Sequence, residues 1–358
     1  MKLTIADIAK QAGVSKATVS RVLNRREDGV GDDTRARILK ILADTGFQPS
    51  ATARCLATGE SRSIGLIIPD IANPFFALLV RGAEAVLNQQ GYSLFLCNAG
   101  RSVAKESDYI RALIEKHVDG VILNSAGSAL DTQVEALEAK GIPVVLLDRV
   151  IKRRESRFGV FVDNQHGARE AVMYLYSRED CDLLFLNGPA ELSQSMERLA
   201  GVEEALHELG IPAQRLRVIN SDFTPEGGYH AVSALLGPAG KGAPLPFNAI
   251  FAANDLMAIG AARALRQRNI RVPEDVELIG FDDIEFAAML EPPLSTIAQP
   301  AQEMGASSAE LLLRLIAGQK PRQKTLVMSP KLVLRGTTRP RPASATQQTP
   351  HTGAIQNG

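Results

Sequence analysis

Residue pairs that contain a polar or charged side chain directly follow several apolar segments of β-strand length. These pairs are Pro69-Asp70, Asp148-Arg149, Asp163-Asn164, Asn254-Asp255 and Asp282-Asp283. Carboxylates accept hydrogen bonds from vicinal hydroxyl groups and arginine donates them back, so this set is suited to binding a polyol. A single Asp after a strand is often only a helix cap. Together, the pairs predict a ligand cleft at the carboxyl ends of parallel strands.

Apolar segments alternate with amphipathic helical stretches from Ser63 onward. The apolar segments are 64–68, 93–96, 120–123, 143–147, 160–162, 183–186, 249–252 and 276–279; examples of the helical stretches are 75–90, 103–117, 194–209 and 255–269. Continuous apolar strands between helices indicate parallel sheets covered on both faces. This number of units exceeds one ordinary open sheet, so we expect two α/β lobes.

The first residues of the chain have a different pattern, that of short helices. A helix would begin at Thr4, whose hydroxyl group can cap it together with Asp7. Its buried face would contain Ile5, Ile8 and Ala9. Gly13 can adopt the positive φ that ends a helix and turns the chain.

A second short helix would follow, capped by Ser15. It would bury Val19, Val22 and Leu23, and it would expose Lys16, Ala17, Thr18, Ser20 and Arg21. Two helices joined by a short glycine-containing turn form a helix-turn-helix, whose second helix lies in the DNA major groove. The alternative is an ordinary helical hairpin. The pattern favours double-stranded DNA as a partner.

This region resembles the DNA-binding head of the LacI/galactose-repressor family. The family string Ala-Gly-Val-Ser-x-x-Thr-Val-Ser-Arg-Val-Leu-Asn is matched by Ala12–Asn24, Val-x-x-x-Thr-Arg by Val30–Arg35, and the linker string Pro-x-x-x-Ala-x-x-Leu by Pro49–Leu56. The resemblance continues to about Arg339. It implies a homodimeric transcriptional regulator, which we expect to be a repressor, on a palindromic operator. The DNA-contacting residues expected from the motif and the resemblance are Thr4, Ser15, Lys16, Ala17, Thr18, Ser20, Arg21, Asn24, Ala53 and Leu56.

The linker has a mechanism of its own in this family. Two short hinge helices form side by side on DNA, and a leucine at the position of Leu56 enters the minor groove, where an apolar wedge kinks the duplex. In this chain Ser50 can cap a helix over 51–57, in which Ala53 and Leu56 lie at helical spacing. So short a helix is unstable alone in water. The alternative is that Leu56 only packs the linker against the body.

The rest of the chain resembles the effector domain of the same family, which is similar to periplasmic sugar-binding proteins. Those proteins have two Rossmann-like lobes joined by three crossovers, with the ligand in the cleft. The resemblance to the sugar-binding, ribose-repressor-like branch implies effector contacts at Asn73, Phe75, Phe76, Asp148, Arg149, Arg198, Phe223, Asn254, Asp282 and Gln299. The purine-binding branch has an arginine six residues before the Arg198 position, where this chain has Leu192. That departure argues against a purine effector.

Charge and composition agree with a DNA-binding head on an acidic body. The whole chain has 40 Lys/Arg and 40 Asp/Glu, but residues 1–62 carry 11 Lys/Arg against 7 Asp/Glu. The three cysteines are widely spaced, which suits reduced thiols in the cytoplasm. We expect no membrane span, no signal peptide and no cofactor. We also expect no metal site, since the five histidines show no ligand spacing.

We therefore expect a helix-turn-helix head over 1–48, a hinge and linker over 49–61, a two-lobed effector-binding and dimerisation domain over 62–339, and a disordered tail over 340–358. The expected effector is a neutral pentose or hexose, with ribose first and a sugar phosphate as the alternative. A soluble sugar-binding protein would explain the body but not the head. The hypothesis of an enzyme with a DNA-binding appendage is weaker still, because no nucleophile elbow, metal cluster or dinucleotide glycine fingerprint occurs in the sequence.

Overall fold

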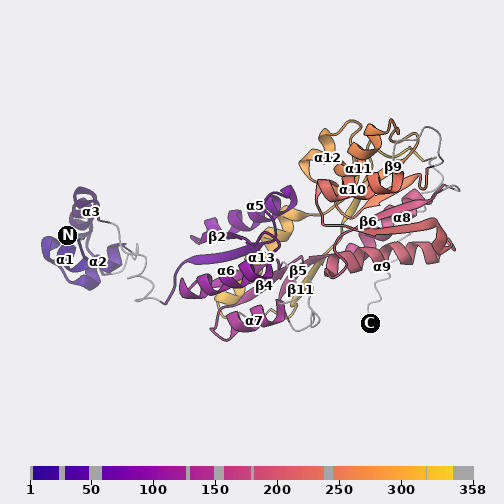
Figure 1. Cartoon of the computed structure of the whole chain (residues 1–358). Helices are drawn as coiled ribbons and strands as arrows, with labels where there is room; N and C mark the ends of the chain where they lie inside the picture. The colour runs from indigo at the N-terminus through magenta and orange to yellow at the C-terminus, as the bar shows by residue number, and fades with distance from the viewer. Residues whose placement is uncertain are drawn as a thin grey trace, which may run out of the picture. The chain divides into compact units, whose positions relative to one another are not determined.

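The computed structural model describes residues 3–23, 29–47, 59–125, 130–148, 157–178, 181–237, 245–319 and 321–341. By their contacts the residues form two units: a head of residues 1–62 with 117–119, and a body that contains the rest. Figure 1 shows the helices of the head and the sheets of the body. In the described part of the chain, no helix has the length and hydropathy needed to cross a bilayer.

The head contains α1 (Ile5–Ala12), α2 (Lys16–Leu23) and α3 (Asp32–Thr45). Thr4 and Asp7 form the predicted capping box, and Gly13 ends α1 with a φ of 64°. Ser15 Oγ accepts a hydrogen bond from the Thr18 backbone N–H at 3.1 Å, which caps α2. The buried residues of the head core are Ile8, Ala9, Ala12, Val19, Val22 and Ile38. Ile5 and Leu23 were predicted to be buried, but they are only half-buried and pack against this core.

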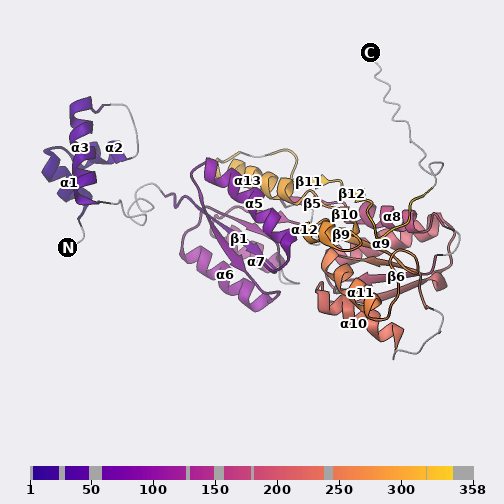
Figure 2. The ribbon, with the colours of Figure 1, turned by 90° about the horizontal axis from the view of Figure 1, so that it is seen from above.

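The first lobe of the body is a six-stranded parallel sheet in the order β11-β5-β4-β3-β1-β2. Its strands are β1 (Ser63–Ile68), β2 (Ser93–Asn98), β3 (Gly120–Leu123), β4 (Val144–Leu147), β5 (Gly159–Val162) and β11 (Thr325–Met328). Helices α5 (Pro74–Gln89) and α13 (Ala301–Ile316) cover one face, and α6 (Val103–Glu115) and α7 (Leu130–Glu138) cover the other (Figures 1 and 2).

The second lobe is a six-stranded sheet in the order β12-β10-β9-β8-β6-β7, in which only the pair β10–β12 is antiparallel. Its strands are β6 (Leu183–Asn187), β7 (Leu216–Asn220), β8 (Ala249–Ala252), β9 (Glu277–Asp282), β10 (Ser295–Ala298) and β12 (Lys331–Val333). Helices α8 (Asn164–Leu175) and α9 (Ser193–Glu208) pack on one face, and α10 (Pro225–Leu236) and α11 (Asp255–Gln267) on the other (Figure 1). The short α12 (Glu285–Met289) follows β9.

The chain passes between the two lobes at three places. It leaves the first lobe after β5, returns after β10 to form α13 and β11, and leaves again to form β12. The two-lobed fold with parallel sheets, predicted from the alternation of strands and helices, is thus confirmed.

Glycine allows the covering helices of each lobe to approach closely. A Cβ atom on Gly82 of α5 would lie 1.9 Å from the Gln302 carbonyl oxygen of α13, and one on Gly260 of α11 would lie 1.8 Å from the Pro225 carbonyl oxygen of α10. The side chains of any other residue would push these helix pairs apart. The helices therefore sit close enough to bury the apolar faces of both sheets.

The outer strand β2 differs from the expectation that the predicted strands are covered on both faces, and β7, the outer strand of the second lobe, was not among the predicted strands. Phe95 and Leu96 on β2 and Val218 on β7 remain exposed. Each strand lies at the edge of its sheet, where apolar side chains and unpaired backbone groups face outward.

Candidate functional site

Helix α2 presents its polar face outward, opposite the buried Val19 and Val22. Lys16, Ala17 and Arg21 are exposed, and Thr18 and Ser20 are half-buried. These are the side chains that a recognition helix directs toward base edges and phosphates. The predicted contacts Asn24, Ala53 and Leu56 lie outside the described residues.

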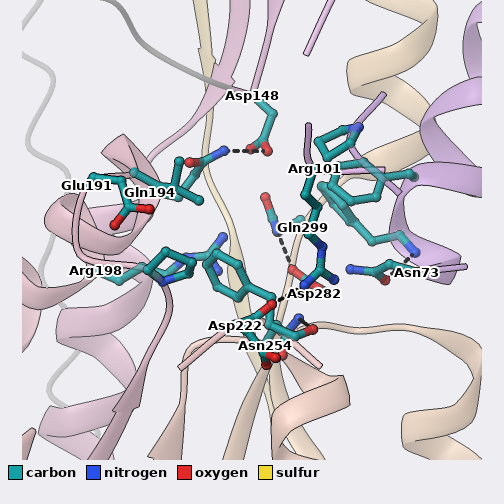
Figure 3. Close-up of a pocket in the computed structure, with 16 residues that line it drawn as sticks. Asn73, Arg101, Asp148, Glu191, Gln194, Arg198, Asp222, Asn254, Asp282 and Gln299 are labelled. Carbon is teal, nitrogen blue, oxygen red and sulfur yellow. Dashed lines mark hydrogen bonds between the residues drawn. The ribbon is translucent and has the colours of Figure 1, made fainter. Parts of the chain in front are cut away.

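A cavity of about 150 Å³ lies between the two lobes of the body (Figure 3). It brings together all the predicted effector residues that the structure describes: Asn73, Phe75, Phe76, Asp148, Arg198, Phe223, Asn254, Asp282 and Gln299. The predicted contact Arg149 lies outside the described residues. Residues that the sequence did not single out as contacts also line it: Pro69, Arg101, Pro189, Glu191, Leu192, Gln194 and Asp222.

Helix caps place two of these side chains. Asn73 Oδ1 accepts a hydrogen bond from the Phe75 N–H at 3.0 Å at the start of α5, and Asn254 Oδ1 accepts one from the Met257 N–H at 2.9 Å at the start of α11. Asn254 Nδ2 also donates to the Phe223 carbonyl oxygen at 3.1 Å. Both asparagines therefore serve as helix caps and as cavity wall.

Two of the polar residues after strands have structural partners rather than a place in the cavity. Asp163 caps α8 by accepting from the His166 N–H at 3.0 Å. Asp255 is buried and accepts from the Thr296 hydroxyl at 2.6 Å and the Ile284 N–H at 2.9 Å. Capping and core bonding thus account for these two, whereas Asp148 and Asp282 face the cavity.

The cavity wall contains residues with unusual backbone conformations. Asp148 has a φ of 64°, Phe223 of 61°, Arg101 of 59° and Asp282 of 122°. Positive φ is uncommon outside glycine, and for a bulky residue such as Phe it costs conformational energy. Such costs persist where the surrounding structure fixes a side chain for a function.

Two carboxylate–amide pairs stand in the wall. Gln194 Nε2 donates to Asp148 Oδ2 at 3.1 Å, and Gln299 Nε2 donates to Asp282 Oδ1 at 2.7 Å (Figure 3). A carboxylate only accepts, so each amide must turn its nitrogen toward it and its oxygen elsewhere. The oxygens Asp148 Oδ1, Gln194 Oε1 and Gln299 Oε1 are buried and have no hydrogen-bond partner in the described part of the chain.

Arg198 is buried beside these acceptors. Its Nε donates to Asn164 Oδ1 at 2.9 Å, its Nη1 donates to the Ala253 carbonyl oxygen, and its guanidinium lies 3.8 Å from the centre of the Phe281 ring. Burial lowers the pKa of Arg198, while Asp282 and Asp148 oppose that shift. The guanidinium is thus fixed as a donor in the wall.

Burial also raises the pKa of Asp282 to about 7, against the opposing effects of Arg198 and the Gln299 hydrogen bond. Asp282 therefore loses its charge at a higher pH than an exposed aspartate does. A ligand that donates to this carboxylate would favour its ionised form.

The sequence carried a signal for two of the missed residues. Gln194 precedes Arg198 by one helical turn, so the two share a face of α9. Asp222 directly precedes the predicted contact Phe223 in the sequence. No comparable signal existed for Arg101, which follows the edge strand β2 and reaches the cavity through the arrangement of the lobes.

A helix-turn-helix head and a two-lobed α/β body with a cavity between its lobes define a ligand-responsive DNA-binding protein. Comparison with known proteins identifies the family of the chain. Residues 4–50 match the bacterial regulatory proteins of the lacI family, and residues 160–338 match the periplasmic binding protein-like domain. The chain belongs to the LacI family of bacterial regulatory proteins.

Curated relatives cover nearly the whole chain. The transcriptional repressor PurR of Vibrio parahaemolyticus is 35% identical over 339 residues, 94% of this chain and 98% of that protein. The transcriptional repressor CytR of Escherichia coli is 34% identical over 339 residues, 95% of this chain and 97% of that protein.

Solved structures agree with these relatives. A lac repressor dimer bound to operator and the anti-inducer ONPF has a TM-score of 0.82 at 27% identity, and the match covers 94% of this chain and 99% of that chain. A LacI family regulator from Enterococcus faecium with bound ribose has a TM-score of 0.69 at 31% identity, and the match covers 78% of this chain and 100% of that chain. The chain is thus a LacI-family DNA-binding transcriptional regulator with an effector-binding domain, and these relatives are transcriptional repressors, not enzymes.

Proposed function

We propose that this regulator is a repressor, and that its operator affinity changes when a neutral pentose or hexose, ribose first, binds in the cavity between the lobes. The observation that carries the proposal is the set of unpartnered buried acceptors on Asp148, Gln194 and Gln299. Buried acceptors without donors are costly, so a ligand that supplies several hydroxyl donors would remove that cost.

The other lining side chains suit the same ligand. Arg198 can donate to sugar oxygens. Phe76 and Phe223 are half-buried and can cover the C–H faces of a ring, whereas Phe75 is buried in the core of the first lobe and packs edge-on against Phe76 at 5.4 Å between ring centres. The cavity lies between two lobes and joins polar groups with apolar and aromatic side chains, as small-molecule sites do.

Two alternative ligands fit this wall less well. Among the described lining residues, the carboxylates Asp148, Glu191, Asp222 and Asp282 outnumber the cations Arg101 and Arg198. A phosphate group would be repelled by these carboxylates, and it has no hydrogen atoms to donate to the unpartnered acceptors. A sugar phosphate is therefore the second candidate, and its phosphate would need Arg149 as a partner. A purine is disfavoured because the apolar Leu192 lines the cavity where the purine-binding branch has arginine.

On the DNA side, we propose that Lys16 and Ala17 at the start of α2 reach base edges, with Thr4, Ser15, Thr18, Ser20 and Arg21 around them. Asn24 and the hinge residues Ala53 and Leu56 belong to the same proposal from the sequence alone. A palindromic operator requires two heads, and the lac repressor structure is a dimer on its operator. The exposed apolar side chains on β2 and those on β7 are two places that a second copy would cover.

The proposed domain boundaries are 1–48, 49–61, 62–339 and 340–358. The start of the third domain is supported to within one residue, because the contacts of the body begin at Ser63. We also propose that the protein acts in the cytoplasm, where its operator is. A soluble sugar-binding protein of another class would have no use for the head.

The test is a ligand screen followed by calorimetry. Free pentoses and hexoses, their phosphates and purines are added to the full chain, and the melting temperature is followed, because a ligand that binds only the native state raises it. We expect a neutral sugar to give the largest shift and to bind with measurable heat. Tight binding of a phosphorylated sugar together with no heat from every free pentose and hexose would overturn the neutral-sugar proposal.

A further inference from the structure

Arg101 makes a polar bridge across the cleft. It follows β2 in the first lobe, and its Nη1 donates to the carbonyl oxygen of Asp222, which follows β7 in the second lobe. Its Nη2 lies 3.2 Å from Asp70 Oδ2, on the same side of the cleft as its own backbone. Arg101 and Asp222 both line the cavity, so the bridge forms part of its wall (Figure 3).

The loop that carries Arg101 is fixed to the first lobe. The Arg101 N–H donates to the Pro69 carbonyl oxygen at 3.0 Å, and the Ile71 N–H donates to Asn98 Oδ1 at 3.1 Å. Arg101 has positive φ, and its ion pair with Asp70 ties one end of the guanidinium to the first lobe. The donor is therefore held in position by its own lobe.

The acceptor is fixed equally well to the second lobe. The Ser221 N–H donates to the Asn187 carbonyl oxygen at 2.8 Å, and the Asp222 carboxylate accepts from the Thr224 hydroxyl at 2.6 Å. The next residue, Phe223, has positive φ and its carbonyl oxygen accepts from Asn254. With both backbones anchored and Nη2 held by Asp70, a movement of the lobes apart would break the hydrogen bond between Arg101 Nη1 and the Asp222 carbonyl oxygen.

We propose that Arg101 is a latch, whose bond to the Asp222 carbonyl holds the two lobes together before any ligand binds and so limits the rates at which effector enters and leaves. The latch depends on the proposed function only in the identity of the ligand, a neutral sugar. A guanidinium is needed because its rigid fork reaches Asp70 and the Asp222 carbonyl at once, which a lysine ammonium does less well. Arg101→Lys should therefore weaken the latch and Arg101→Ala should remove it.

The first test measures the distance between the lobes in the ligand-free protein. Spin labels are placed at Lys105→Cys on α6 and Glu226→Cys on α10, both exposed, with Cys55→Ser to remove one thiol and the buried Cys97 and Cys181 left in place. We expect Arg101→Ala to lengthen and broaden the distance distribution, with Arg101→Lys in between. Arg111→Ala is the matched control, because this exposed arginine of the first lobe pairs with Asp108 within α6. Unchanged distributions in both Arg101 variants would overturn the latch.

The second test is stopped-flow kinetics with the sugar that the ligand screen identifies. Loss of a latch should raise the association and the dissociation rate constants together, each by at least about tenfold, the lower end of the range for one hydrogen bond to a charged group. A rise in the dissociation rate constant alone would overturn the latch and make Arg101 a direct ligand contact. If no sugar binds, the proposed effector fails, while the spin-label distances still decide the latch.

Discussion

Replacement of Asp148 by asparagine separates ligand binding from the fold. Asp148 is buried, its Oδ2 accepts from Gln194 at 3.1 Å, and its Oδ1 has no partner in the described part of the chain. Asparagine has nearly the same shape, tolerates the φ of 64° at this position better than most residues, and keeps an acceptor for Gln194. The change therefore removes the charge and one acceptor without opening a cavity.

The expected loss of affinity follows from the hydrogen bond that the ligand would lose. A hydrogen bond to a charged group contributes about 1.5–3 kcal/mol, which corresponds to roughly a 10- to 150-fold rise in the dissociation constant of the sugar. The free energy of unfolding of the ligand-free protein should change little, because removal of a buried oxygen without a partner is offset by loss of the Asp148 charge near Arg198. Affinity and stability should thus change independently.

Calorimetry with the identified sugar and thermal unfolding without it measure the two quantities. Asp108→Asn is the matched control, since this carboxylate on α6 is largely exposed and pairs with Arg111. Sugar affinity of Asp148→Asn within twofold of that of the control would refute the reasoning, because Asp148 would then make no contact with the ligand.

Other perturbations test the remaining parts of the account. Exchange of Lys16 and Ala17 should alter operator preference by about 1–3 kcal/mol per changed base contact in competition gel shifts; equal weakening on all sequences would make them phosphate contacts. Leu56→Ala should lower operator affinity and DNA bending in a circular-permutation assay and leave sugar affinity unchanged; undiminished bending would exclude a wedge. Sugar affinity should fall as the pH drops below about 7, where Asp282 becomes protonated and its carboxylate is lost as a charged acceptor, by at most about tenfold per pH unit; the same pH profile in Asp282→Asn would contradict this. Arg198→Ala should cost sugar binding about 2–5 kcal/mol in calorimetry and leave operator binding in gel shifts intact; an unchanged sugar response would remove Arg198 from the site.

The architecture was predictable because its signals are local. The capping box at Thr4, the turn at Gly13 and the buried positions of α2 each depend on residues a few places apart. The two lobes followed from apolar strands that alternate with helices. The edge strand β2 could not be told from a covered strand, because burial depends on its place in the sheet rather than on its own composition. The edge strand β7 was not predicted.

The candidate site was predictable in part. Residues after strands reach one cleft because the carboxyl ends of parallel strands meet there, which accounts for Asp148 and Asp282. Asp255 follows a strand too, yet it is buried against Thr296, since neighbouring residues at a strand end point in different directions. Arg101 could not be inferred, because its partner belongs to the other lobe and only the tertiary structure joins them.

The most direct test of the account is operator binding with and without the effector. A labelled palindromic operator is titrated with the wild-type protein and with Asp148→Asn, in the presence and absence of the identified sugar, and fluorescence anisotropy reports the dissociation constant. We expect the sugar to change the operator affinity of the wild type by at least about tenfold, the effect of a typical coupling free energy, and to leave that of Asp148→Asn unchanged at the same concentration. An operator affinity of the wild type that responds to no neutral sugar, and responds instead to a purine or to a phosphorylated sugar, would contradict it.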